Sequence, residues 1–157
     1  MKLQRIYLDT SVLGGCYDPE FEEWSNGLMR DFRSGRFKPV LSQVTATELR
    51  EAPESVQALF AELLALNAEI IEASENALEL ADAYQAHNIL TNKFYDDGLH
   101  IAIATVAEVD VLVSWNFKHI VRFDKIRFFN AVNLEYGYKP LQIFSPREVT
   151  SHGTAEN

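Results

Sequence analysis

The chain has 157 residues, a length that favours one domain with a core large enough to be stable without disulfide bonds or bound metals. Its content of 47 % apolar and 24 % charged residues is ordinary for a globular protein. The only cysteine, Cys16, excludes an intramolecular disulfide and fits a reducing cytosol, and we expect neither a signal peptide nor a membrane helix. The net charge of −9, taken alone, argues against a nucleic-acid-binding protein, because acidic residues repel phosphates.

The first half of the chain is predicted to alternate between strands and helices. A short buried strand over residues 5–9 ends on Asp9, and Thr10 and Ser11 can cap the next segment. An amphipathic helix is expected over residues 20–34, because large apolar residues recur there at helical spacing, and Gly35 ends it. The remaining elements of this half are a strand over 37–42 and helices over 45–51 and 54–66.

The second half continues the same alternation. Expected here are a strand over 69–72, a helix over 75–87, a helix from Thr91 to about residue 107, a strand over 109–114, helices over 118–123 and 125–136, and a strand over 141–145. Residues 145–148 open a terminal turn. Because strands alternate with helices throughout, we predict an α/β fold with a mainly parallel sheet covered on both faces. One domain is expected over residues 1–149, with a polar, disordered tail over 150–157.

The charges are unevenly distributed. The segment between residues 51 and 92 contains eight acidic residues and no Lys or Arg, so the rest of the chain is nearly neutral. Basic residues cluster in two places, over residues 30–38 and 118–127. A negative helix pair with basic rims elsewhere is compatible with contact to RNA, although solvated helix faces explain any single charge equally well.

Four residues with oxygen-bearing side chains lie near element ends that can converge on one crevice. Asp9 ends the first strand, Glu48 follows the second strand, Asp97 lies near the start of the 91–107 helix, and Asn116 follows the strand over 109–114. Sites in open α/β sheets form beyond the carboxyl ends of the strands. Clustered carboxylates need protons or a cation to offset their repulsion, and oxygen ligands favour Mg²⁺ or Mn²⁺. With one cysteine and four histidines without ligand spacing, the sequence gives no sign of a zinc site.

Each of these residues also has a structural interpretation. Asp9 can cap a helix, and Thr45 with Glu48 fits the capping-box pattern Ser/Thr-x-x-Glu. Asp97, near the start of its helix, can interact favourably with the helix macrodipole, and Asn116 can be a turn residue. Neighbouring Asp96 is expected to point to solvent more than Asp97, because Asp97 adjoins the apolar stripe of its helix.

Taken together, the motifs resemble the PIN domain family, the fold of the VapC-type toxin ribonucleases. YLDTSVLGG is similar to the first motif of that family, VTATELREA to the second, YDDGLHIAIA to the third, and SWNFKHI to the last. The resemblance implies a three-layer α/β/α sandwich in which Asp9, Glu48 and Asp97 hold the metal. It also implies a catalytic part for Asn116, which stands where many members have an acid, and supporting parts for Ser11, Ser114 and Asp96.

What the resemblance implies about function is specific. We expect an endoribonuclease that depends on Mg²⁺ or Mn²⁺, acts as the toxin of a type II toxin–antitoxin pair, forms a homodimer and is inhibited by a small antitoxin. The residues expected to hold RNA phosphates are Lys118, Arg122 and Arg30. The cytoplasm is the expected compartment, and no membrane partner is expected.

Two other functional classes remain as hypotheses. The first is a catalytically weak or inactive binding module on the same fold, motivated by the uncharged Asn116 and the acidic composition. The second is a phosphohydrolase with an aspartyl nucleophile, which is disfavoured because Ser11 stands where such enzymes need a second acid. A response-regulator receiver is also disfavoured, since no acid pair adjoins the first strand.

Overall fold

The computed structural model describes residues 2–152, which fold around one five-stranded sheet. Its strands are β1 (Gln4–Leu8), β2 (Phe37–Ser42), β3 (Glu69–Ile71), β4 (Val111–Val113) and β5 (Ile143–Phe144), in the order β3-β2-β1-β4-β5. All four neighbouring pairs are parallel. The predicted α/β class with a mainly parallel sheet is therefore confirmed.

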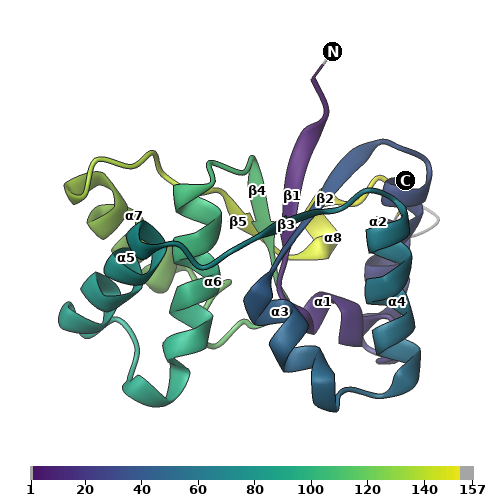
Figure 1. The fold of residues 1–157 in the computed structure, drawn as a ribbon, viewed down its shortest axis with the longest axis horizontal. Helices are drawn as coiled ribbons and strands as arrows, with labels where there is room; N and C mark the ends of the chain where they lie inside the picture. The colour runs from purple at the N-terminus through teal and green to yellow at the C-terminus, as the bar shows by residue number, and fades with distance from the viewer. Residues whose placement is uncertain (1, 153–157) are drawn as a thin grey trace.

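Helices cover both faces of the sheet (Figure 1). On one face α5 (Glu75–Ala86), α6 (Tyr95–Val106) and α7 (Phe123–Glu135) pack on the strand residues Tyr7, Val40 and Leu112. On the other face α1 (Thr10–Gly15), α2 (Glu22–Arg33) and α4 (Glu54–Ala65) pack on the alternate strand residues Ile6, Leu41 and Val113. Side chains alternate across a strand, so each of β1, β2 and β4 buries apolar residues in both layers, as a sheet covered twice requires.

The carboxyl ends of the central strands define one edge of the sheet. In Figure 1, β1 runs from the N-terminus at the top down to α1. The strand order places β2 and β4 on opposite sides of β1, so successive connections diverge there. Helix α1 begins two residues after β1 ends, and α3 (Gln43–Glu48) begins directly after β2. This divergence is the place where open α/β sheets form their crevice.

One predicted helix is wrong. Residues 117–120 form a single turn, residues 121–122 are irregular, and helix α7 starts at Phe123. The reason is local, because the backbone N–H groups of Ile120 and Val121 both donate to the carbonyl oxygen of Asn116, at 3.1 and 2.8 Å. These bonds converge on one acceptor, so they close a turn without starting a helical ladder.

The other expected elements are present within a few residues, and the segment after Asp9 forms α1, for which no helix was predicted. Short 3₁₀ turns, η1 (Leu49–Glu51) and η2 (Asn92–Phe94), follow α3 and precede α6, and the expected terminal turn forms α8 (Pro146–Val149). A capping box between Ser145 and Glu148 opens that helix.

The first residues of the predicted tail contact α2. The Thr150 hydroxyl donates to Asp31 Oδ2 at 2.8 Å, and the Ser151 amide donates to the same atom at 3.0 Å. Asp31 is fully buried, and these hydrogen bonds, together with an ion pair to Arg36 at 4.0 Å, offset the cost of burying its carboxylate. Residues 153–157 lie outside the described residues, so the disordered tail stays a prediction.

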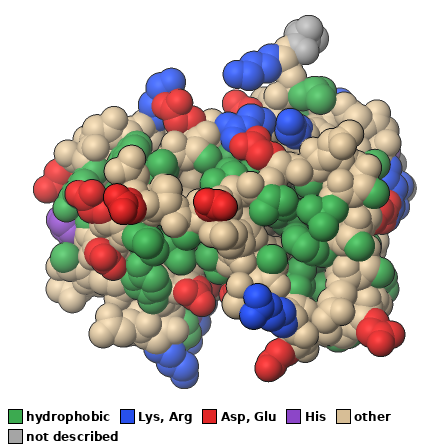
Figure 2. All heavy atoms as spheres, viewed as in Figure 1, with side chains coloured by type: hydrophobic (Ala, Val, Ile, Leu, Met, Phe, Trp, Pro, Cys, Tyr) green, Lys and Arg blue, Asp and Glu red, His purple; other side chains and the backbone are tan. Residues whose placement is uncertain are grey.

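The acidic segment between residues 51 and 92 is only partly neutralised. Glu62 pairs with Arg33, and Glu69 pairs with Arg5 at 2.6 Å. Figure 2 shows acidic side chains gathered mainly on the left half of one face, with exposed hydrophobic side chains between them. Along the described part of the chain, no helix has the length and apolar character needed to cross a membrane.

Candidate active site

Asp9 lies at the carboxyl end of β1 and is almost completely buried, with 5 % of its surface exposed. It occupies the N-cap position of α1, but its side chain makes no capping bond. Its two oxygens accept hydroxyl hydrogens instead, from Ser11 Oγ at 2.6 Å and from Ser114 Oγ at 2.5 Å. The interpretation of Asp9 as a helix cap is therefore wrong, and two hydroxyls fix the orientation of its carboxylate.

Glu48 is the last residue of α3, so the capping-box interpretation of Thr45 and Glu48 is also wrong. The cap of α3 is Ser42, whose side chain accepts the Val44 amide hydrogen at 3.2 Å. One oxygen of Glu48, Oε1, accepts from Thr10 Oγ1 at 2.6 Å and lies 2.8 Å from His100 Nε2. Glu48 is thus tied to the residue after Asp9 and to α6.

Asp97 stands in the first turn of α6 and is half-buried, whereas Asp96 is exposed. Asp97 Oδ2 accepts from the Asn116 side-chain amide at 3.2 Å and lies 3.0 Å from His119 Nδ1. No bond joins Asp96 to these groups in the described structure, and its supporting part stays a prediction.

Asn116 contributes a donor to the site. Its side-chain oxygen accepts the backbone N–H groups of Lys118 and His119, at 3.2 and 2.9 Å, which leaves the Nδ2 group to face Asp97. The backbone N–H group of Asn116 donates to Ser114 Oγ at 2.9 Å, and the Ser114 hydroxyl in turn donates to Asp9. A hydrogen-bonded path therefore connects Asp9 with Asp97 through Ser114 and Asn116.

The electrostatics of the cluster centre on His100, which is buried. Burial raises the pKa of Asp9 and of Asp97, and nearby histidines only partly oppose it. Burial acts to raise the pKa of Glu48, but the hydrogen bond and charge of His100 outweigh it and lower that pKa. Burial acts to lower the pKa of His100, yet Glu48, Asp9 and Asp97 together raise it. All three acids therefore lie close enough to act on one imidazole.

These shifts predict how the stability of the metal-free chain depends on pH. Asp9, Asp97 and His100 bind protons more tightly folded than unfolded, so their contributions are lost as pH rises through their folded pKa values. Glu48 acts oppositely, and its contribution is lost only as pH falls through its lowered pKa. We expect Tm in EDTA to fall as pH rises between about 5 and 8. Thermal unfolding monitored by circular dichroism checks this, and a Tm that rises over that range contradicts it.

The donor chemistry of the site fits a divalent cation. The acids offer hard oxygen atoms, which suit Mg²⁺ or Mn²⁺, and the hydrogen bonds to buried Asp9 come from neutral hydroxyls. Between residues 2 and 152, no three His, Cys, Asp or Glu side chains already form a group that could hold a metal. In the described arrangement His100 contacts only Oε1 of Glu48 and His119 contacts only Oδ2 of Asp97, which leaves the second oxygen of each carboxylate without a histidine contact.

A basic cavity of about 370 Å³ adjoins the Asp97 side of the cluster. Its lining includes Lys118, His119, Arg122, Lys125 and the ring of Phe94, which lies 3.8 Å from the His119 ring. Two of the three predicted phosphate-binding residues are therefore neighbours here. The third, Arg30, is exposed on α2, which covers the opposite face of the sheet, so the structure does not bring it to this cavity.

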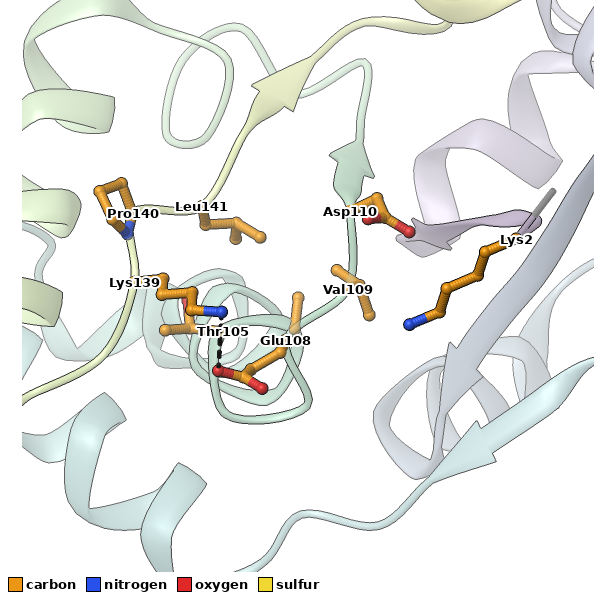
Figure 3. A pocket seen from close by; sticks show the side chains of 9 residues that line it. Lys2, Thr105, Glu108, Val109, Asp110, Lys139, Pro140 and Leu141 are labelled. Carbon is orange, nitrogen blue, oxygen red and sulfur yellow. Dashed lines mark ion pairs between the residues drawn. The ribbon is translucent and has the colours of Figure 1, made fainter.

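A second cavity, of about 320 Å³, lies near the amino ends of β1, β4 and β5 (Figure 3). Lys139 and Glu108 are 3.9 Å apart there, and Lys2 and Asp110 also line it. Its lining charges are of both signs, and it includes no residue of the acid cluster. It therefore plays no part in the chemistry of that cluster.

His100, His119 and Thr10 belong to the site but were not predicted as site residues from the sequence. His100 follows Asp97 by three residues, and a helix places such residues on one face, so this spacing was the available signal. His119 follows Asn116 by three residues, but it lies in a segment that was predicted as a helix and forms a turn instead. Thr10 was considered only as a cap.

No protein-family model matches the chain, and a comparison with curated proteins gives no significant match. Solved structures do match. The VapBC2 complex of Rickettsia felis with promoter DNA contains a chain that is 18 % identical, with a TM-score of 0.57, covering 90 % of this chain and 98 % of that one. FitAcB of Neisseria gonorrhoeae matches with 17 % identity and a TM-score of 0.58, over 90 % and 97 %. VapC20 of Mycobacterium tuberculosis, described as a toxin that cleaves the sarcin–ricin loop, matches with 14 % identity and a TM-score of 0.55, over 73 % and 92 %. These likenesses confirm the predicted PIN-like fold.

Proposed function

We propose that this chain of PIN-like fold is a metal-dependent endoribonuclease and the toxin of a toxin–antitoxin pair. The observation that carries the proposal is the hydrogen-bonded arrangement at the carboxyl edge of the sheet: Asp9 is linked to Asp97 through Ser114 and Asn116, and Glu48 is bonded to Thr10 and buried His100. Structural neighbours described as toxins, one of which cleaves RNA, support it.

The residues of the chain have distinct parts in this proposal. Asp9 and Asp97 would hold Mg²⁺ or Mn²⁺, with Glu48 as a further ligand or as the acceptor that orients the attacking water. When bound, the ion activates water and neutralises charge at the scissile phosphate. Ser11 and Ser114 hold the Asp9 carboxylate in one orientation through its two hydroxyl contacts. Asn116 orients Asp97 through its side-chain amide, since its oxygen already accepts two backbone N–H groups.

The test is cleavage of RNA by the purified chain. Incubation with a mixed set of single-stranded and structured RNAs is expected to give Mg²⁺- or Mn²⁺-dependent internal cuts that EDTA abolishes. If no RNA is cut at any metal concentration, the proposed activity is wrong. Calorimetric titration with Mn²⁺ then separates the alternatives, because absence of both heat and thermal stabilisation favours the non-catalytic binding module, for which the uncharged Asn116 is the specific observation.

The basic cavity makes a further prediction about substrate. Changing Lys118 and Arg122 together to Gln is expected to weaken RNA binding. The association constant should also become less sensitive to salt: the magnitude of the negative slope of its logarithm against log salt concentration should decrease by about 1.4, at about 0.7 per lost contact to a single strand. Fluorescence anisotropy with labelled RNA in EDTA, which prevents cleavage, measures both quantities.

The matched control changes Lys2 and Lys139 to Gln. It removes the same formal charge from the cavity near the amino ends of β1, β4 and β5. An equal loss of affinity in both double variants would show that net charge, and not this cavity, governs RNA binding.

The proposed partners are a small antitoxin and a second copy of the chain. Neighbours described as toxin–antitoxin complexes support the antitoxin. A short gene for a DNA-binding protein beside this one would support it further, and light scattering of the purified chain tests the dimer. We place the activity in the cytoplasm, where a reducing medium keeps Cys16 a thiol.

A further inference from the structure

His100 stands at the centre of a hydrogen-bonded relay that begins on β2. The Val44 amide donates to Ser42 Oγ at 3.2 Å, and Ser42 Oγ lies 2.7 Å from the Tyr7 hydroxyl. That hydroxyl lies 2.6 Å from His100 Nδ1, and His100 Nε2 lies 2.8 Å from Glu48 Oε1. Tyr7 and Ser42 are completely buried and His100 nearly so, which makes the relay an interior feature of the fold.

The two ring nitrogens of His100 have different partners, and these partners decide which nitrogen carries a hydrogen. A hydroxyl has one hydrogen and can also accept. Tyr7 therefore donates to Ser42 Oγ when it accepts from a protonated Nδ1, and it donates to a bare Nδ1 when Ser42 donates to it instead. The carboxylate of Glu48 only accepts, so Nε2 must carry a hydrogen in either protonation state of the ring. The Nε2–H group therefore faces Glu48 as long as Glu48 is ionised.

Glu48 is held on one oxygen only. Thr10 Oγ1 and His100 Nε2 both donate to Oε1, and within residues 2–152 no hydrogen bond reaches Oε2. The side chain is 34 % exposed, so Oε2 has room for a ligand from solvent. Thr10 follows Asp9 directly, and His100 lies one helical turn after Asp97. Each donor to Glu48 is thus a neighbour of one of the other two acids.

We propose that His100 is a positioning residue of the acid cluster: backed by Tyr7 and Ser42, it holds Glu48 Oε1 so that Oε2 is presented beside Asp9 and Asp97. The inference rests on the proposed function, because it assigns His100 to the metal site. Groups that orient metal ligands in this way contribute strongly to metal affinity, and losing one typically weakens it by about 10- to 100-fold.

The experiment is calorimetric titration of the purified chain with Mn²⁺ alone. Changing His100 to Leu is expected to raise the Kd for Mn²⁺ by about 10- to 100-fold. His100→Gln is expected to recover most of that loss, because its amide keeps an N–H donor for Glu48. The Kd of Tyr7→Phe for Mn²⁺ is expected to lie between those of the wild type and of His100→Leu, since this change removes only the partner of Nδ1.

The matched controls are His87→Leu, at an exposed histidine, and Tyr84→Phe, at a buried tyrosine bonded to Asn133. Both should bind Mn²⁺ as tightly as the wild type.

A second readout needs no metal. Long-range ¹H–¹⁵N spectra of the metal-free chain report which ring nitrogen carries hydrogen, and we expect Nε2–H for His100 in the wild type. Tyr7→Phe should weaken this fixed preference at neutral pH. If His100→Leu does not fold, His100→Gln and Tyr7→Phe still decide the matter, because both keep a side chain of similar size.

Three outcomes overturn the inference. One is a neutral His100 with its hydrogen only on Nδ1. Another is an unchanged Mn²⁺ affinity in Tyr7→Phe and in every folded His100 variant. The third is tighter Mn²⁺ binding in those His100 variants, which would make His100 a competitor of the metal. If the wild type binds Mn²⁺ and cuts RNA in these cases, only the inference fails. If the wild type neither binds Mn²⁺ nor cuts RNA, the proposed function fails with it.

Discussion

Changing Asp9 to Asn is expected to lower metal-dependent RNA cleavage by at least about 1,000-fold, since an ion that supplies several kcal/mol of transition-state stabilisation loses its buried ligand. The fold should survive the change. Asn has nearly the same shape, and one of the hydroxyls of Ser11 and Ser114 can keep donating to its oxygen while the other rotates to accept from its NH2 group. Because burial raises the pKa of Asp9, losing its charge should leave the metal-free chain at least as stable. Cleavage rates and Tm in EDTA measure the two effects.

The neighbouring acids of α6 provide the matched control. Asp97→Asn should reduce cleavage as strongly as Asp9→Asn, whereas Asp96→Asn should reduce it far less, because Asp96 is exposed and no hydrogen bond joins it to the other site residues in the described structure. The two variants differ by one position and remove the same charge. Equal activity in all three variants and the wild type would show that these acids do not hold a catalytic ion.

Replacing Gly15 with Ala is expected to lower the free energy of unfolding by about 1–3 kcal/mol through overpacking. A Cβ there would lie 2.6 Å from both Ser25 Oγ and Trp115 Nε1, which are themselves hydrogen-bonded at 2.8 Å. In a domain of this size each kcal/mol lowers Tm by about 2–4 °C. Because Trp115 lies between Ser114 and Asn116, we also expect weaker Mn²⁺ binding. Chemical denaturation and calorimetry are the measurements.

Gly14→Ala is the control for that substitution. Gly14 is in the same helix, is exposed, and has no atom within 4 Å of an added Cβ. Alanine has the higher helix propensity, so this change should be neutral or slightly stabilising. A loss of stability in Gly14→Ala as large as in Gly15→Ala would point to the backbone of α1, and not to the contact with Trp115, as the cause.

The capping patterns show why some interpretations needed the structure. Residues 45–48 and 145–148 both have the form Ser/Thr-x-x-Glu, yet only Ser145 and Glu148 form a capping box. In the other case β2 ends on Ser42, which caps α3 first and moves Glu48 to the end of that helix. The end of this strand was predicted correctly, but the four-residue pattern could not show that Ser42 at that end caps the helix before Thr45.

Asn116 illustrates the same limit for side-chain orientation. Its position after the fourth strand followed from the apolar pattern of residues 109–114, but the direction of its amide did not. The turn over residues 117–120 supplies two backbone N–H donors to its oxygen, so only its nitrogen is left for Asp97. The sequence predicted a helix there and therefore could not predict that geometry.

The sequence by itself determined the alternation of strands and helices, the parallel sheet and the location of Asp9 and Glu48 beyond strand ends, because hydrophobic periodicity and element order are local properties. Tertiary structure alone decided that His100 contacts Glu48, 52 residues away along the chain, and that Ser114 contacts Asp9, 105 residues away. Such contacts depend on how α6 and β4 are placed against β1. That placement is set by packing over the whole core, which no single segment encodes.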